Sequence, residues 1–273
     1  MKKRTKLIMC VLLIIILAVI IILVSRSAVC APEGNGYDIV MPTGTPAETP
    51  ENGNGNETEF EENTEEPEIV KELPKIDRVI DFEQLQSKND EIYAWLYIPD
   101  TKINYPILQS KTDNGFYLNH DSDKNSSIAG SIYTENRNSM EYTDYNTLIY
   151  GHNMKNGIMF TDTLKYSDED FFESHRDVYI YTAERAYKYK IFAAYVNDDN
   201  HILVANNFST EEGFQNYLDK ILALTEGVFD KTMEITTDDR IITLSTCNSS
   251  GSQRVLTQAV LEVVYEYEEM DRE

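Results

Sequence analysis

The chain has 273 residues, in which 47 acidic side chains outnumber 24 lysines and arginines, so its formal net charge is −23. A protein this acidic is a poor candidate for binding nucleic acid or anionic lipid through charge. The length suits one folded domain preceded by less structured segments.

The N-terminus predicts a membrane anchor. Four basic residues lie within the first six positions, and residues 7–24 form an uncharged stretch dominated by Leu, Ile and Val. As a helix this stretch would span roughly 27 Å, close to a bilayer core. A cleaved signal peptide is the alternative, but the apolar run exceeds the usual core of about 7–15 residues. Residues 1–30 are therefore expected to form a cytoplasmic basic tail and a single transmembrane anchor, with the rest of the chain outside the cell membrane.

The next segment, residues 31–74, has the composition of an acidic disordered linker. It contains twelve acidic residues against one lysine, and few large apolar side chains that could offset chain entropy by burial. A flexible chain of this length reaches on the order of 40 Å. It would hold residues 75–273, the predicted catalytic domain, off the membrane but near it. A spacer that serves only solubility is the alternative.

The folded segment reads as mainly β. Helical spacing of apolar residues predicts a helix over Asp81–Ala94, with Asp81 as N-cap, and a second helix over Glu211–Leu224. Short runs rich in Tyr, Ile, Val and Thr predict strands over 95–98, 103–108, 130–134, 147–150, 178–182, 186–196 and 241–245. Many short strands with few helices indicate a closed barrel or a sandwich.

The last predicted strand starts near Val255, and every second residue from there is apolar or nearly so. The other phase carries Arg254, Gln258, Glu262 and Glu266, so we expect Arg254 to point away from the core. If this strand pairs with the one that ends at Cys247, the thiol and the Arg254 guanidinium can meet on the outer surface. An arginine there would donate fixed hydrogen bonds to an oxyanion or a substrate carbonyl.

Cys247 is the candidate nucleophile. A free cysteine is more often a small buried hydrophobe, but Cys30 and Cys10 lie outside the folded part, so Cys247 has no disulfide partner there. An unpaired thiol in an oxidising compartment indicates a use. Upstream, the run 148–150 stops at Gly151-His152. Two strand ends would then present a thiol and an imidazole, the pair that a cysteine acyltransferase needs.

Other chemical patterns are weaker. The run Asp121-x-Asp123-x-Asn125 opens like a calcium loop, but Ser126 and Ile132 occupy positions that need Gly and Glu. The other three histidines lack the spacing of a metal site. We therefore expect surface histidines and no metal or cofactor. Three alternatives to this interpretation of the Cys–His pair exist. Papain-like peptidases place the Cys before the His in the chain, whereas here His152 precedes Cys247, and L,D-transpeptidases have a different motif around the Cys. The third alternative is a non-enzymatic surface binding module.

Three separated motifs resemble a class B sortase. They are Thr243-Leu244-Ser245-Thr246-Cys247 followed by Arg254, Tyr150-Gly151-His152-Asn153-Met154 with Met159-Phe160 after it, and Asp81-Phe82 to Trp95 leading into Ile98 to Pro106. The likeness covers residues 80–265 in the family's order of His, Cys and Arg. It implies a closed eight-stranded β-barrel with an N-terminal helix and a helix in the loop before the strand that carries the cysteine.

The resemblance also implies roles for individual residues. Cys247 would attack the Thr carbonyl of a C-terminal sorting signal and form a thioester, with His152 as general acid and then base, and Arg254 at the oxyanion or the substrate. Ser245 and Thr246 of the same motif would contact substrate. The implied partners are surface proteins that carry a sorting signal and a peptidoglycan, cell-wall or pilin amine. Which motif and which amine are used, and whether pili are assembled, stays open.

Overall fold

The computed structural model describes residues 73–248 and 253–268. The predicted membrane anchor, and all but the last two residues of the predicted linker, lie outside this part. Within it, no helix combines the length and the apolar character needed to cross a bilayer.

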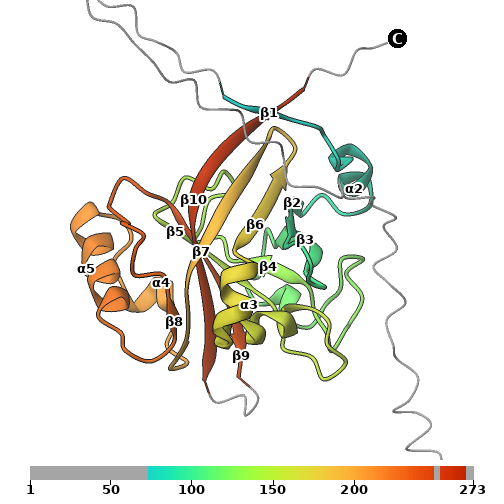
Figure 1. Ribbon diagram of the computed structural model, residues 1–273. Coiled ribbons are helices and arrows are strands. Elements are labelled where there is room, and N and C mark those ends of the chain that lie inside the picture. The colour runs from blue at the N-terminus through green and yellow to red at the C-terminus, as the bar shows by residue number, and fades with distance from the viewer. Residues whose placement is uncertain (1–72, 249–252, 269–273) are drawn as a thin grey trace, which may run out of the picture. The chain divides into compact units, whose positions relative to one another are not determined.

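Eight strands form a closed barrel (Figure 1), in the spatial order β10-β9-β5-β4-β3-β2-β6-β7, and pairing of β10 with β7 closes the circle. Their bounds are β2 (Ile92–Tyr97), β3 (Asn104–Gln109), β4 (Ile132–Thr134), β5 (Asn146–Tyr150), β6 (Asp177–Thr182), β7 (Arg185–Asn197), β9 (Ile241–Cys247) and β10 (Arg254–Tyr267). Two short strands, β1 (Lys75–Ile76) and β8 (Val228–Phe229), pair with β10 and β7. The mainly β, closed eight-stranded barrel is confirmed.

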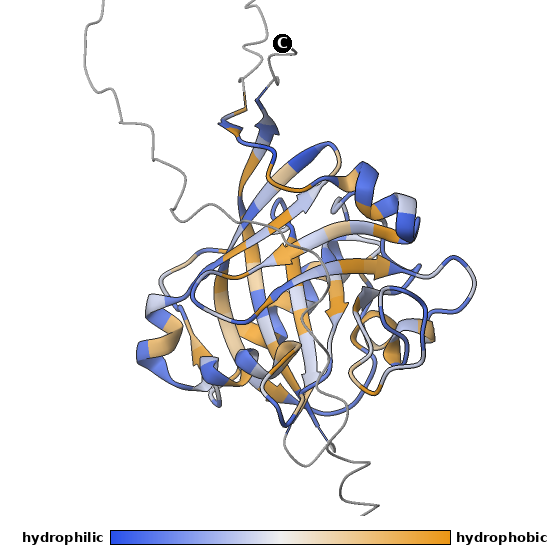
Figure 2. Ribbon diagram, turned by 90° about the vertical axis from the view of Figure 1, so that its right-hand side faces the viewer, coloured by the Kyte–Doolittle hydropathy of each residue, from blue (hydrophilic) through white to orange (hydrophobic). Residues whose placement is uncertain are grey.

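The barrel interior is the main hydrophobic core. Apolar side chains from every barrel strand meet there, among them Ile107, Ile149, Ile180, Ile191 and Leu244, each at most 1% exposed. Figure 2 shows the hydrophobic residues concentrated on the strands and the hydrophilic ones on the connecting loops. Burial of one such side chain stabilises the fold by about 1.5–3 kcal/mol.

A second core lies on the outer face of β5, β7, β9 and β10, under helices α4 (Ile202–Ala205) and α5 (Glu211–Leu222). Thr210 caps α5 by accepting a hydrogen bond from the Gly213 amide, and Phe214 and Leu218 on the buried side of α5 are fully covered. The predicted helix in the loop before the Cys-bearing strand is therefore present, and it ends two residues early.

This cover buries one polar residue of the outward phase of β10. Glu262 and Glu266 of that phase are exposed, but Gln258 is completely buried under α5. Its Nε2 donates to the Tyr217 hydroxyl at 2.7 Å and lies 2.9 Å from Thr243 Oγ1. An amide is tolerated there because its hydrogen bonds are satisfied within the protein. Alternation along a strand identifies its two faces but does not show which face a helix covers.

The N-terminal helix α2 (Phe82–Lys88) is shorter than predicted. Asp81 caps it as expected, with Oδ1 accepting from the Gln84 amide at 2.9 Å. The chain leaves the helix at Asn89, whose side chain donates to the Tyr117 hydroxyl at 2.8 Å and to the Ser122 carbonyl. The residues after it belong to β2, which is buried on both faces, and a continuous apolar run does not distinguish a helix from a buried strand.

Further helical turns, which we did not predict, precede β6. They are η2 (Phe160–Ser167) and α3 (Glu169–Ser174), and Phe160, Tyr166 and Phe172 from these turns join the barrel core. A shorter turn, η1 (Phe116–Leu118), lies between β3 and β4. The turns η2 and α3 therefore close part of the barrel with aromatic side chains.

Arg176 fastens β8 to the barrel. Its Nε donates to the Ile191 carbonyl at 2.8 Å, and its Nη2 pairs with Asp230; the two side chains are 12% and 11% exposed. Burial raises the pKa of Asp230, but hydrogen bonds from Thr232 and Arg176 outweigh this and hold it at about 2, below its ordinary 3.8.

We therefore expect Asp230→Asn to lower the free energy of unfolding by about 2 kcal/mol at neutral pH. Because the folded-state pKa of Asp230 is depressed, this difference is present above pH 4 and disappears as the pH falls through about 2. Urea titrations at pH 7 and pH 3 measure it. Glu173→Gln is the control, since Glu173 lies 3.8 Å from Arg176 and is 68% exposed. An equal loss of unfolding free energy in both variants would contradict the assignment of this stabilisation to Asp230.

Candidate active site

The thiol and the guanidinium are brought together by the register of two strands. Cys247 is the last residue of β9, Arg254 is the first residue of β10, and the two are direct partners in the antiparallel pair. Arg254 Nη1 donates to Cys247 Sγ at 3.1 Å. Both side chains are half-buried. A permanently charged guanidinium at this position attracts negative charge that develops on the sulfur or on a carbonyl oxygen bound beside it.

His152 lies beside the same strand end. It follows β5, which runs parallel to β9 with Tyr150 opposite Ser245, and the Gly151 amide donates to the Ser245 carbonyl at 3.2 Å. On the other side of His152, Asn153 Nδ2 donates to the Cys247 carbonyl at 3.2 Å. Both neighbours of His152 are therefore hydrogen-bonded to β9 near the thiol. Asn153 is a positioning residue that we did not assign from the sequence, although it lies within the motif.

The hydrogen bond of the His152 ring fixes which nitrogen can exchange a proton. His152 Nε2 lies 2.7 Å from the carbonyl oxygen of Leu118, at the end of η1. A carbonyl only accepts, so Nε2 carries a hydrogen in this arrangement. Nδ1 is then the nitrogen available to give or take a proton.

A tight loop holds the imidazole. The Phe160 amide donates to the His152 carbonyl at 2.9 Å, and Asn153 and Met159 form an isolated β-bridge. At Gly151, an added Cβ would lie 2.6 Å from both Ile132 Cδ1 and Phe160 Cγ. No larger residue fits there without displacing core side chains, which explains why a glycine precedes the histidine.

Two stacked tyrosines extend the site across the sheet. Tyr133 of β4 pairs with Tyr150 of β5, and their ring centroids are 5.2 Å apart. Burial, and next the Glu135 carboxylate, raise the pKa of Tyr133 to about 12, while the nearby Arg254 guanidinium acts to lower it. Tyr133 therefore stays protonated at neutral pH and can donate a hydrogen bond. Tyr150 belongs to the motif around His152, whereas Tyr133 has no signal in the sequence beyond a general richness in tyrosine.

A cavity of about 130 Å³ opens beside Arg254, with Ser245, Tyr150, Glu135 and His201 in its wall. Ser245 lies two residues before Cys247 and so shares its face of β9. Thr246 lies on the opposite face and is 3% exposed, so only Ser245 of the two predicted substrate-binding residues lines this cavity.

His201 is not the free surface histidine that we expected. Its Nε2 lies 3.0 Å from each carboxylate oxygen of Glu135 and 3.3 Å from the Tyr150 hydroxyl. His120 and His175, by contrast, stack on Phe116 and Phe171, away from these contacts. One of the three histidines therefore belongs to the wall of the cavity, a contact between distant segments that spacing does not reveal.

Comparison with known proteins settles the family. The sortase domain model matches residues 96–262. The chain belongs to the sortase family. It is 41% identical over 165 residues to sortase B of Listeria monocytogenes, covering 60% of this chain and 66% of that protein. This sortase thus spans about two thirds of the length of that relative.

Solved structures agree with the class. The structure of a Staphylococcus aureus sortase B–substrate complex is similar with a TM-score of 0.60 and 30% identity, over 67% of this chain and 84% of that one. Sortase B of Bacillus anthracis in complex with AAEK1 matches with a TM-score of 0.60 and 35% identity, over 66% of this chain and 84% of that one. The resemblance to a class B sortase is confirmed, rather than one to papain-like peptidases or L,D-transpeptidases.

The acidic loop that opens like a calcium site forms a hydrogen-bonded turn in this sortase. Asp121 Oδ1 accepts hydrogen bonds from the Asp123 and Asn125 amides at 3.0 and 2.8 Å, which forms a turn. Across residues 73–248 and 253–268, no cluster of three or more His, Cys, Asp or Glu side chains has the geometry of a metal site.

Proposed function

We propose that this sortase is a membrane-anchored cysteine transpeptidase. It cleaves a C-terminal sorting signal after Thr through a thioester and transfers the acyl group to a cell-wall or pilin amine. The observation that carries the proposal is the contact of Cys247 Sγ with Arg254 Nη1 at the strand end where the His152 loop is fastened. The partners are surface proteins with such a signal and an amine-bearing wall precursor.

In the acylation step the Cys247 sulfur attacks the Thr carbonyl carbon, and the carbonyl oxygen becomes negatively charged. Arg254 lies beside the sulfur and donates hydrogen bonds to that oxygen or orients the carbonyl. His152 Nδ1 gives a proton to the departing amine as the C–N bond breaks, which leaves the thioester. An incoming amine then attacks the thioester, and the same nitrogen takes its proton. Water in place of the amine gives hydrolysis, a peptidase activity.

The acyl donor is assigned to the cavity beside Arg254. Ser245 of β9 and Arg254 of β10 line it on the face of the sheet that carries the thiol, so a peptide lying there presents a carbonyl to the sulfur. The similar Staphylococcus aureus sortase B has been solved as a substrate complex, which supports a peptide substrate.

Residues 1–30 are proposed to anchor the enzyme in the cell membrane, with the N-terminus in the cytoplasm and the catalytic domain outside. The acidic segment 31–74 acts as a flexible tether. Confinement of enzyme and membrane-bound substrate to one surface raises their effective concentration without any new contact.

The test is a comparison of the full chain with a chain that lacks residues 1–26. Both should cleave the same members of a library of sorting-signal peptides and show a peptidyl thioester by mass spectrometry. In cells only the full chain should anchor much protein. A folded protein that cleaves no Thr-containing peptide in the library would contradict the enzymatic proposal. Equal anchoring by both forms would contradict the tethering proposal alone.

A further inference from the structure

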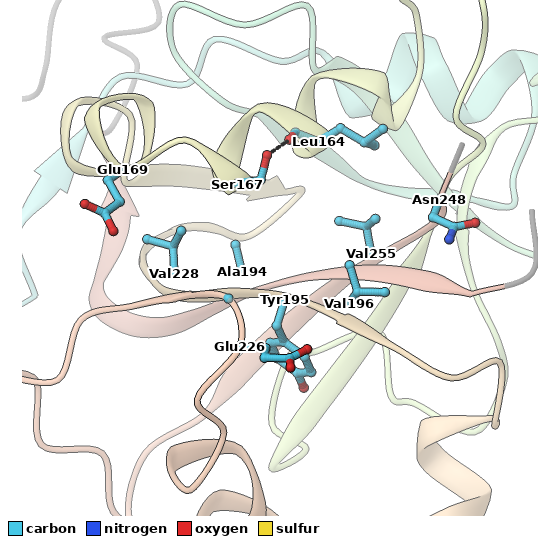
Figure 3. Close-up of a pocket in the computed structure, with 11 residues that line it drawn as sticks. Leu164, Ser167, Glu169, Ala194, Tyr195, Val196, Glu226, Val228, Asn248 and Val255 are labelled. Carbon is cyan, nitrogen blue, oxygen red and sulfur yellow. Dashed lines mark hydrogen bonds between the residues drawn. The ribbon is translucent and has the colours of Figure 1, made fainter. Parts of the chain in front are cut away.

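A second hollow lies on the other side of the strand end that carries the thiol. Its cavity volume is about 540 Å³, and Ala194, Val196, Val228 and Val255 line it between the strands and η2 (Figure 3). Val255 is the direct partner of Thr246 on one side and of Val196 on the other. Because Val255 follows Arg254 and neighbours alternate, this hollow faces away from the side of β10 on which the guanidinium lies. We call it the valine groove.

The valine groove ends at the residue next to the nucleophile. Asn248, the residue directly after Cys247, lines one end of it, and Glu169 of α3 lies at the opposite end (Figure 3). The cavity beside Arg254 and the valine groove therefore border the Cys247–Arg254 pair from the two faces of the β9–β10 end.

The chemistry of the groove favours a ligand that is apolar along its length and cationic. Val196 is 55% exposed, although valines in strands are usually covered, so an apolar surface is left open inside a hollow. The only charged residues among the described lining are Glu169 and Glu226, both exposed; neither belongs to an ion pair in the described part of the chain. No lysine or arginine is among the lining residues that the structure describes, so the field of the groove attracts positive charge.

We propose that the valine groove is the acceptor site of this sortase. It holds a short peptide of small apolar residues that carries a primary amine: the negative field of Glu169 and Glu226 attracts the cationic peptide into the groove, and its amine reacts at the Asn248 end. This proposal rests on the proposed transpeptidase function, in which the acyl donor occupies the face of the thiol. The amine nitrogen attacks the thioester carbonyl, the C–S bond breaks, Cys247 leaves as a thiolate, and His152 Nδ1 takes the proton released by the nitrogen.

The decisive variant is Val196→Lys, which places a cation on the groove floor at an exposed position. The probes are N-acetyl-Ala-Lys-Ala-Ala-amide, which has one free amine, and hydroxylamine, which is too small to need a groove. We expect KM for the peptide amine to rise about tenfold or more, equivalent to about 1.4 kcal/mol. The rates of thioester formation, hydrolysis and reaction with hydroxylamine should remain as in the parent enzyme.

The chain offers matched controls. Val204→Lys changes a valine that is 61% exposed on α4 and lines neither hollow, so KM for the peptide amine should not change. Glu169→Gln should raise that KM modestly at low salt and less at high salt, whereas Glu212→Gln, in the first turn of α5, should not.

An unchanged KM in Val196→Lys, or an equal rise in Val204→Lys, would overturn the acceptor assignment. So would an equal loss of the hydroxylamine reaction, because that would place the defect in acylation or in the thiol. If the proposed transpeptidase function itself is wrong, the unmodified enzyme forms no thioester. That result is distinct from any change in KM for the peptide amine.

Discussion

Cys247→Ala should abolish thioester formation and peptide cleavage while leaving the fold intact. Among the residues that the structure describes at the β9 end, the sulfur is the group placed to form the covalent intermediate, because Ser245, the nearest described serine, is 5% exposed and two positions deeper in the strand. Mass spectrometry of the enzyme mixed with a cleavable peptide measures the acyl adduct directly. Thermal unfolding of the variant confirms that the domain is still folded.

The other cysteine outside the apolar stretch 7–24 supplies the control. A methanethiosulfonate reagent should inactivate the parent enzyme and a Cys30→Ala variant equally, since both keep Cys247. Protection by a bound sorting-signal peptide would place the modified thiol in the donor site. Full cleavage activity in Cys247→Ala would reject the nucleophile assignment, and with it the acylation step.

Arg254→Ala should lower kcat by about 10² to 10³, the usual effect of removing one oxyanion donor. Arg254→Lys should recover little, because a single ammonium on a flexible stem does not reproduce the guanidinium donor that lies 3.1 Å from the sulfur. Steady-state kinetics with a cleavable peptide give kcat, and the yield of thioester shows whether acylation is the affected step. Arg185→Ala is the control, since Arg185 is the exposed first residue of β7.

The imidazole completes the test of this site. If His120 or His175 were required for turnover while His152→Ala retained it, the constellation of Cys247, His152 and Arg254 would be wrong. A nearly unchanged kcat in Arg254→Ala would instead reject the role of the guanidinium as an oxyanion donor.

The sequence predicted those parts of the site that depend on strand ends. Apolar runs that stop at Gly151-His152 and at Cys247, and a final strand that begins at Arg254, place three functional groups near one end of a β-sheet before any coordinates are known. The structure adds the register: Arg254 and Cys247 are direct partners in the antiparallel pair, which puts their side chains on the same face.

The parts that could not be predicted depend on contacts between distant segments. Nothing near Gln258 in the sequence shows that α5 covers it, since the helix lies more than thirty residues away along the chain. The bond between His201 and Glu135 likewise joins positions 66 residues apart. The helix predicted over 81–94 ends early, at Lys88, for a local reason. The apolar residues of β2 fit helical and buried-strand patterns equally well.

The 14-residue strand β10 separates the chemistry from the point where the folded domain begins. Arg254 starts the strand, while β1, the first element after the predicted linker, pairs with Glu266 and Tyr267 at its other end (Figure 1). At about 3.3 Å per residue the strand extends for about 40 Å. Under the proposed anchoring, the length of β10 sets the distance between the attachment point of the domain and the thiol. A small rotation of the domain about that point therefore moves the thiol over a long distance.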